Sequence, residues 1–387
     1  MKILKSLAAY SLIIVLIFSF SACHPKDEVA MTIGDVQITS ALYMCALIQA
    51  DGEARNLIDK NAAEGVENID YFKQKIEGAD YTDWVKNRAE EICKEYAAYE
   101  LKFAEAGLEI SEDTQSEIDF YTDYYWNTAG LGKFYEKNGV AFQTYKKFFT
   151  YSYKAREYFE SIYGKDGTNP VSEEELKSAM DENFVLVNQL YASYTDTDGN
   201  DLSDDAKAEI KQKFESYVTR LNNGESFETI YNEYNATDDN DENDDNNQDG
   251  QDASGQPEES TTSNEDESDN TDDTPKPQDK NAIILGDSDT NFASEIFSDV
   301  KAMSPGEVKI IEPSSSTGIY LIVRKDILSD PYYLDYLNLE ILKLLKQTEF
   351  ENMIKEYANS LQFNKNNYAV NRFKVKKIVQ YEDVYNE

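Results

Sequence analysis

The sequence predicts an α+β protein: a mostly helical N-terminal domain completed by a C-terminal helix, plus a small α/β domain with a long acidic insertion. Three observations predict this class. Apolar residues recur every three or four positions through most of residues 40–163. Strand-like runs gather between residues 184 and 325. Between them, residues 236–280 contain no Val, Ile, Leu, Met or aromatic side chain.

The N-terminus has the pattern of a secretory signal. Two lysines precede an apolar run shorter than the ~20 residues of a membrane-spanning helix, and small residues precede Cys23. The Ser-Ala-Cys ending resembles a bacterial lipobox, although Phe20 stands where Leu is usual. We expect residues 1–22 to be a signal peptide, Cys23 to carry lipid and residues 23–28 to form a tether. An ordinarily cleaved signal is the alternative. Lipidation would anchor the protein to the cell membrane on the extracytoplasmic side of a bacterial envelope.

Residues 29–165 are predicted to form the helical domain, which opens with a hairpin around Gly34 and Asp35. The next residues are expected to be helical up to a polar stretch that begins near Gly52. Helical spacing then predicts longer helices in three places: Trp84–Phe103, a segment beginning at Ser111, and Phe142–Tyr163. The aromatic residues between Phe120 and Tyr163 are predicted to be core, and an exposed face for unfolded chains is the alternative.

Two further cysteines, Cys45 and Cys93, lie on the predicted helices. Outside the cytoplasm they could form a disulfide. The alternative is that both are small buried apolar residues, and we favour it.

The α/β domain is predicted over residues 166–330. Ser172 and Glu175 have the spacing of a capping box. Before the acidic interruption at residues 236–280, we predict a strand at Phe184–Tyr194 and helices at Ala206–Leu221 and Phe227–Tyr234. After it, we predict a helix at Phe292–Val300, a turn at Pro305–Gly306, and strands at Glu307–Glu312 and Gly318–Lys325.

The interruption at residues 236–280 holds 17 acidic and 2 basic residues. With nothing apolar to bury, it cannot offset the ~1–2 kcal/mol of backbone entropy per ordered residue, so we expect it to be disordered. The segment from Asp245 to Gly250 starts like a calcium loop, but Gln256 stands where a bidentate Glu is needed. Diffuse cation attraction is therefore expected rather than a specific metal site.

Residues 331–387 begin with a helical pattern. We expect residues 364–367 to turn the chain and Tyr368–Ile378 to form a strand, because apolar and polar residues alternate there.

Several motifs resemble the exported foldases of the SurA/PrsA type, which carry a parvulin-like peptidyl-prolyl isomerase domain. The resembling stretches are the opening Val29–Thr39, Asn223–Ile230, Phe292…Phe297 with Met303–Val308, and Thr317–Val323, in the family's order. The resemblance implies that residues 331–387 pack on the N-terminal domain. It also implies a groove that binds unfolded, newly exported polypeptides.

The same resemblance locates a site. It places the family's two catalytic histidines at Gln189 and Tyr320, and the apolar binding residues at Phe292, Phe297, Met303 and Phe227. The sequence has one histidine, His24, beside the expected lipid anchor. We therefore expect the histidine pair to be replaced by a hydrogen-bonded Gln189–Tyr320 pair, and isomerase activity to be weak or absent. No cofactor and no metal site is expected.

Composition bounds the remaining function classes. The formal charge of -38 disfavours nucleic acid as a partner. Three hypotheses stay open: a membrane-anchored foldase or chaperone with a degenerate isomerase domain, a surface scaffold lipoprotein whose acidic loop binds a basic partner or cations, and an active isomerase with a groove that lacks histidine. The third is disfavoured because neither Gln nor Tyr titrates near neutral pH as His does.

Overall fold

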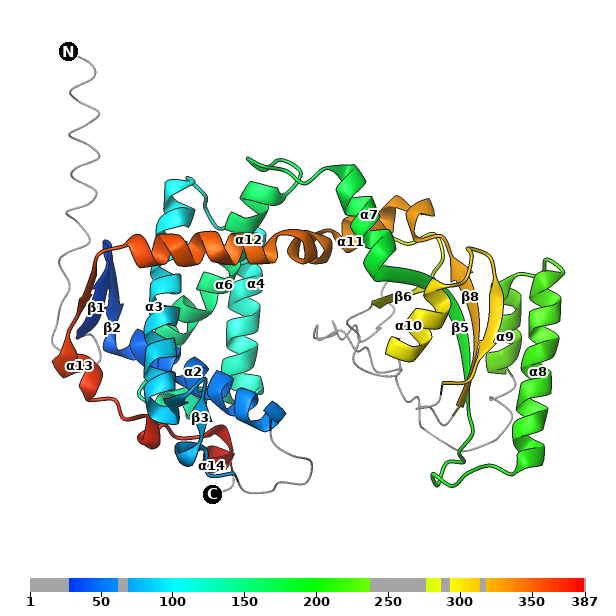
Figure 1. Cartoon of the computed structure of the whole chain (residues 1–387), viewed down its shortest axis with the longest axis horizontal. Helices are drawn as coiled ribbons and strands as arrows, with labels where there is room; N and C mark the ends of the chain where they lie inside the picture. Colours follow the sequence, from blue (N-terminus) through cyan, green and yellow to red (C-terminus); the bar gives the residue numbers. More distant parts are fainter. Residues whose placement is uncertain (1–27, 62–68, 237–275, 287–292, 314–317, 386–387) are drawn as a thin grey trace, which may run out of the picture. The chain divides into compact units, whose positions relative to one another are not determined.

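The computed structural model describes residues 28–61, 69–236, 276–286, 293–313 and 318–385 (Figure 1). The chain divides into two compact units. One holds the described residues of Met1–Pro170 and Lys346–Glu387, and the other those of Val171–Leu345. The α+β class is confirmed, with long helices in the first unit and a four-stranded sheet in the second. The expected signal peptide, Cys23, and residues 237–275 of the acidic insertion lie outside the described residues.

The first unit is built on three long helices: α2 (Ser40–Asn61), α3 (Tyr81–Glu105) and α6 (Phe142–Tyr163). Val85, Ala89, Ile92 and Tyr96 follow one another at helical spacing on α3 and are fully buried, so this face forms the centre of the core. Shorter elements surround it: η1 (Tyr71–Lys73), β3 (Lys75–Ile76), β4 (Ala79–Asp80), α4 (Glu112–Asp123), the π-helical turn η2 (Tyr124–Thr128) and α5 (Leu131–Lys137).

The first long helix extends into the polar stretch that begins near Gly52. Helix α2 runs through this residue to Asn61. A helical glycine costs about 1 kcal/mol relative to alanine, but the residues around it bury one face of the helix and outweigh that cost. Ala50 and Ala54 are both fully buried against the core.

A three-stranded sheet joins the two ends of the chain in this unit. The predicted hairpin is confirmed as β1 (Val29–Ile33) and β2 (Val36–Thr39), with Gly34 at φ +55° in the turn. Strand β9 (Phe363–Lys365) pairs antiparallel with β1, with Ile33 opposite Phe363. The sequence therefore returns to its start after more than three hundred residues, and the C-terminal segment completes the N-terminal fold (Figure 1).

The predicted strand at Tyr368–Ile378 is wrong. This stretch forms α13 (Asn367–Asn371) and the 3-10 turn η5 (Val375–Lys377), and α14 (Tyr381–Tyr385) follows. The side chain of Asn366 accepts hydrogen bonds from the amides of Tyr368 and Ala369, which begins a helix where alternation indicated a strand. The strand that pairs with β1 lies a few residues earlier, in the stretch expected to be a turn.

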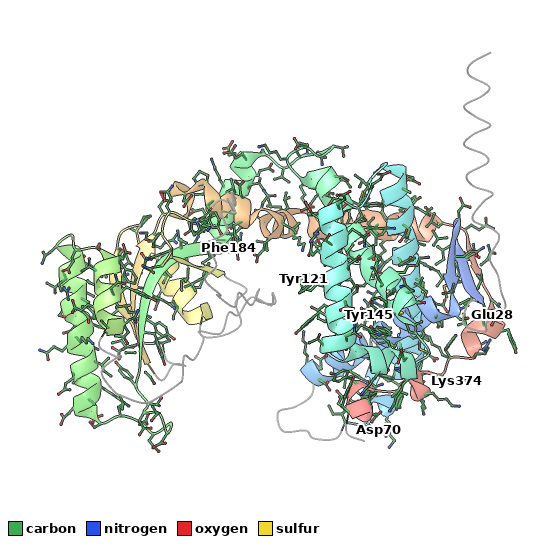
Figure 2. The ribbon with its side chains drawn as sticks, turned by 180° about the vertical axis from the view of Figure 1, so that it is seen from behind. Glu28, Asp70, Tyr121, Tyr145, Phe184 and Lys374 are labelled. Atoms are coloured by element: carbon green, nitrogen blue, oxygen red, sulfur yellow. The ribbon has the colours of Figure 1, made fainter. Side chains whose placement is uncertain are left out.

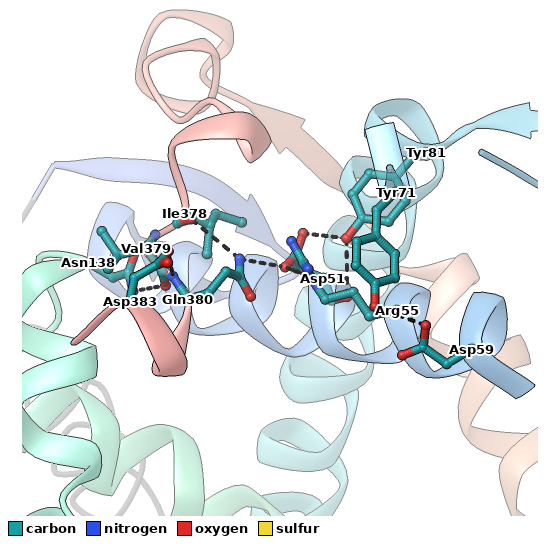
Figure 3. Close-up of polar contacts among 10 residues, drawn as sticks. All are labelled: Asp51, Arg55, Asp59, Tyr71, Tyr81, Asn138, Ile378, Val379, Gln380 and Asp383. Carbon is teal, nitrogen blue, oxygen red and sulfur yellow. Dashed lines mark hydrogen bonds and ion pairs between the residues drawn. The ribbon is translucent and has the colours of Figure 1, made fainter. Parts of the chain in front are cut away.

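A buried carboxylate connects α2 to the C-terminal tail (Figure 3). Asp51 is 2 % exposed and accepts hydrogen bonds from Tyr81 Oη at 2.7 Å, Arg55 Nε at 2.9 Å and Gln380 Nε2 at 3.0 Å. Burial and the Asp51 carboxylate raise the pKa of Tyr81, so its hydroxyl stays a proton donor. The Arg55 guanidinium also lies over the Tyr71 ring, 4.4 Å from its centroid. The tail is thereby held by a charged hydrogen-bond network as well as by apolar packing.

Cys45 and Cys93 are both free and fully buried in this core. The prediction of two small apolar residues is confirmed, and no disulfide joins them. Burial raises the pKa of both thiols far above the usual value, so neither is a nucleophile in the folded protein.

The second unit contains an antiparallel sheet of order β6-β5-β8-β7. Its strands are β5 (Phe184–Ser193), β6 (Ile283–Gly286), β7 (Val308–Ile311) and β8 (Gly318–Lys325). The capping box is confirmed at the start of α7 (Glu173–Asn183), where Ser172 and Glu175 bond each other's backbone amides. Three more helices follow in sequence: α8 (Asp204–Asn222), α9 (Phe227–Ala236) and α10 (Ala293–Lys301). Strand β6 was not predicted, because it is four residues long and directly follows the acidic segment.

Helices α8 and α9 cover one face of this sheet, and α10 lies on the other (Figure 1). Leu190, Ile319 and Leu321 pack with Phe214 and Ile230 of α8 and α9. On the opposite face, four sheet residues pack with the apolar side of α10: Val185, Val187, Tyr320 and Ile322. The alternation follows from the two-residue period of a strand, and it decides which side chains can share a site.

The unit ends later than the predicted boundary at residue 330. Helices α11 (Pro331–Tyr336) and α12 (Asn338–Ser360) follow the short turn η4 (Ile327–Ser329). Tyr333, Leu337 and Ile341 pack against Met180 and Phe184, so the division falls after Leu345, inside α12. No helix within the described ranges is long and apolar enough to cross a membrane.

Candidate functional site

The two positions where the family resemblance places histidines lie on neighbouring strands of the second unit. In the β5–β8 register, Gln189 is opposite Ile322 and Tyr191 is opposite Tyr320. Paired residues point to the same face of a sheet, and so do residues two apart on one strand. Gln189 and Tyr320 are therefore diagonal neighbours on the face that α10 covers in part.

Two tyrosine rings form an aromatic pair at this position. The centroids of Tyr191 and Tyr320 are 4.7 Å apart, with the rings tilted by 38°. Tyr320 is buried, whereas Tyr191 is 39 % exposed. The Tyr191 ring lies directly on Gly318, where an added Cβ would come within 2.4 Å of the ring atom Cε2. Glycine at this position therefore lets the ring lie flat on β8, and the pair presents one aromatic side to solvent.

Gln189 adds a hydrogen-bond acceptor beside the rings. Its side chain is half-buried, and its Oε1 has no hydrogen-bond partner in the part of the chain that the structure describes. The expected hydrogen bond between Gln189 and Tyr320 is therefore not made through this oxygen. A buried amide oxygen without a donor costs about 1–3 kcal/mol, and a ligand N–H would remove that cost. We define Gln189, Tyr191 and Tyr320 as the amide–aromatic site.

The predicted apolar residues do not all reach this face. Phe297 of α10 and Met303 pack against this face, but both are buried in the core, with 7 % and 4 % exposure. Phe227 packs with Phe214 and Leu190 on the opposite face of the sheet. Phe292 lies outside the described residues. Of the three described residues, Phe227 is separated from Phe297 and Met303, because α9 packs on one face of the sheet and α10 on the other.

Tyr191 is the residue of this site that sequence reasoning missed. It stands two positions after Gln189 in the predicted strand, so alternation already places both on one face. What the sequence could not show is the register. Only the pairing with Tyr320, and the glycine at 318, bring the two rings together.

A second group of exposed aromatic side chains lies in the helical unit, on α4 and η2. Phe120 is 65 % exposed and Tyr124 is 40 % exposed, and their rings stack with centroids 6.5 Å apart. Tyr121 and Tyr125 stack beside them at 6.2 Å, and both are half-buried (Figure 2 labels Tyr121). The prediction of core is correct for other aromatics of this run, such as Tyr145, Phe148 and Phe159, but wrong for Phe120. We define Phe120, Tyr121, Tyr124 and Tyr125 as the α4 aromatic strip.

The π-helical turn explains why this strip faces outward. Residues 124–128 are wound with one extra residue in the turn, and Ala129 N bonds Tyr124 O at 2.9 Å. This insertion shifts the helical face, so Trp126 turns inward against Tyr145 while Tyr124 is left exposed. Such turns are frequent at functional sites.

Metal sites and pockets are the other features of the described ranges that bear on chemistry. No group of three or more His, Cys, Asp or Glu there could hold a metal ion. A hollow of about 460 Å³ lies beside Leu57, Ile58 and Ile76, next to residues 62–68, which are not described. It is not part of the amide–aromatic site.

No protein-family model matches the chain, and no curated protein matches it. Solved structures do. Its structural neighbours are PrsA foldase proteins. The foldase protein PrsA from Streptococcus pneumoniae shares 10 % identity at a TM-score of 0.33, covering 81 % of this chain and 97 % of that one.

Two further PrsA structures are similar to the chain. The protein from Lactococcus lactis shares 9 % identity at a TM-score of 0.36, covering 91 % of this chain and 100 % of that one. The protein from Bacillus subtilis shares 13 % identity at a TM-score of 0.27, covering 81 % and 97 %. Likeness at this level assigns neither an activity nor a ligand to the chain.

Proposed function

We propose that this protein is an extracytoplasmic, lipid-anchored foldase that binds unfolded exported polypeptides and has lost most or all isomerase activity. The observation that carries the proposal is the amide–aromatic site. An unpartnered amide oxygen at Gln189 lies beside the exposed ring of Tyr191. An extended peptide offers what this site lacks, namely a backbone N–H donor and an apolar or proline side chain to cover the ring.

The loss of isomerisation follows from the groups that stand at the site. Rotation about a peptide bond has a barrier of about 18–20 kcal/mol, so an isomerase must stabilise a twisted amide. In the family that the sequence resembles, two histidines provide the polar groups. Here an amide and a phenol replace them, and neither changes its charge near neutral pH. Binding of the ground-state peptide remains possible, but binding it does not lower the barrier.

The α4 aromatic strip supports the same function. Exposed aromatic side chains that contact one another are uncommon on monomeric surfaces and are frequent at binding sites. Unfolded polypeptides expose apolar side chains without defined shape, and a row of rings can accept them without requiring one sequence. We infer that the strip is a second contact for clients.

The binding function is tested by suppression of aggregation of an unfolded client. We expect Tyr191→Ala and the double variant Phe120→Ala/Tyr124→Ala each to weaken suppression several-fold. Tyr368→Ala is the matched control, because Tyr368 in α13 is 76 % exposed and belongs to neither site. Equal suppression by wild type and both site variants would overturn the proposal.

The isomerase question needs a separate assay. In proline-limited refolding of a client, we expect the wild type to leave the slow phase unchanged. Acceleration by wild type, with its loss in Gln189→Ala or Tyr191→Ala, would instead establish an active isomerase without histidine. Each variant must retain the wild-type circular dichroism spectrum for the comparison to hold.

The membrane anchor is tested independently of both. If Cys23 carries lipid, Cys23→Ser moves the protein from the membrane fraction to the soluble fraction of bacterial cells, and the mature chain loses the mass of the lipid. Retention of Cys23→Ser in the membrane fraction would contradict the anchor.

A further inference from the structure

Two buried cations without acceptors lie in the second unit, and the foldase proposal does not use them. Arg324 on β8 is 5 % exposed, and its Nε and Nη1 have no hydrogen-bond partner within the described residues. Lys301, in the last turn of α10, is in the same situation, because its Nζ is buried and unpartnered. Neither side chain forms an ion pair with a carboxylate of the described residues.

The backbone holds Arg324 firmly in this position. It is paired with Val187 of β5, its amide donates to Glu307 O at 3.0 Å, and its carbonyl accepts from Gly306 N at 2.7 Å. Strand alternation directs the side chain to the same face as Tyr320 and Ile322, the face that α10 covers. The side chain therefore lies on the α10 side of the sheet, where it is 5 % exposed.

The two cations influence each other. Burial lowers the pKa of Lys301, and the nearby charge of Arg324 lowers it further, against the opposite effect of Asp181. Burial also lowers the pKa of Arg324, opposed by Asp181 and Asp326. Asp181 and its neighbour Glu182 lie in the last turn of α7 and are exposed, so they compensate only at a distance through solvent.

An unpaired buried guanidinium is costly, and arginine cannot give up its proton. An anion that accepts hydrogen bonds from Nε and Nη1 would remove this cost. We propose that Arg324 and Lys301 form a binding site for a carboxylate between β8, α10 and the end of α7. A carboxylate is favoured over a phosphate because it carries a single charge and needs less desolvation to enter a buried position. Its planar oxygens also match the donors of a guanidinium.

Two sources could supply the carboxylate: an acidic side chain or C-terminus of a bound polypeptide, or an acidic residue of the chain's own segment 237–275. The described end of that segment contacts the same strand, since Asp279 pairs with Lys325, the residue after Arg324, at 2.9 Å, but strand alternation directs Lys325 to the opposite face of the sheet. The site itself consists of Arg324 and Lys301 alone, and the experiment separates the sources.

The test is calorimetric unfolding of the chain in sodium acetate and in sodium chloride at equal ionic strength. We expect a saturating acetate-specific rise in Tm of ~2 °C or more, because a ligand that binds the folded state stabilises it by mass action. Arg324→Met and Lys301→Met remove the rise. Lys309→Met is the matched control, since Lys309 lies on β7 of the same sheet but pairs with Glu307 at the surface, and it keeps the rise.

Deletion of residues 237–275 distinguishes the sources. If the chain's own segment fills the site, the full chain responds little to acetate, the deletion lowers Tm in an Arg324-dependent way, and acetate restores it. If the carboxylate is external, the deletion changes nothing and acetate stabilises both forms. Either outcome supports a carboxylate site.

Four outcomes would overturn it. An acetate response that persists in Arg324→Met shows a different site. If neither acetate nor the deletion changes Tm in a way that depends on Arg324, no anion is bound at this site. If Asp181→Asn lowers Tm as much as Arg324→Met does, and the double variant loses no more, Arg324 forms an internal ion pair with Asp181 instead. An Arg324-dependent response to sulfate and not to acetate would refute the carboxylate in favour of another oxyanion.

Discussion

Removal of the Asp51 carboxylate is expected to destabilise the helical unit severely. Asp51→Ala leaves the fully buried hydroxyl of Tyr81 with only a weak contact to Asp51 O at 3.4 Å, at about 1–3 kcal/mol. It also removes the charged hydrogen bond from Arg55, worth about 1.5–3 kcal/mol, and one bond to Gln380. Because these bonds share one acceptor, we expect a total loss of about 4 kcal/mol rather than their sum. Asp51→Asn, which keeps the shape and an acceptor for Tyr81, is expected to lose about half as much.

Urea unfolding followed by tryptophan emission measures this loss in the correct unit. The sequence contains two tryptophans, Trp84 and Trp126, and both lie in the helical unit. A loss of about 4 kcal/mol lowers the urea midpoint by ~2 M if the slope is about 2 kcal/mol per M. Asp59→Ala is the matched control, because Asp59 accepts from Tyr71 Oη at 2.9 Å at the surface. A midpoint change in Asp51→Ala no larger than that of Asp59→Ala would refute the reasoning.

Three further predictions concern other parts of the fold. Ser172→Ala removes the capping box of α7 and should cost about 1 kcal/mol, measured by thermal unfolding followed by circular dichroism, and an unchanged Tm would contradict the cap. In a Cys23→Ser background, Cys45 and Cys93 should react with a thiol reagent only at the rate of unfolding, because both are fully buried, and rapid labelling under native conditions would show an open core. The hydrogen bond from Lys211, at 2.6 Å, lowers the pKa of Glu312 below its ordinary 4.5. The pair therefore contributes stability above that pH, and the contribution is lost as pH falls through the lowered pKa. Carboxyl NMR titration should show the pKa of Glu312 rising in Lys211→Met, and an unchanged value would exclude Lys211 as the cause.

The predictions that held are those in which neighbouring residues decide the structure. The capping box at Ser172, the limits of Phe142–Tyr163 and the strand Gly318–Lys325 all follow from local spacing and end signals, and all match the structure. The predictions that failed depended on distant partners. The helix continues through the exposed Gly52 because its neighbours Ala50 and Ala54 are buried in the core, and Phe363–Lys365 is a strand because β1 offers it an edge.

The site divides in the same way. The sequence alone determined that no histidine pair can exist, since its one histidine is His24, and that Gln189 and Tyr320 stand where the resemblance places that pair. Only the tertiary structure brought Tyr191 against Tyr320 and left Nε and Nη1 of Arg324 without an acceptor among the described residues, because the β5–β8 register and the placement of α10 are set by the packing of the whole sheet. Residue types and local geometry are written in short stretches of chain, whereas burial and pairing between distant strands exist only once the core has formed.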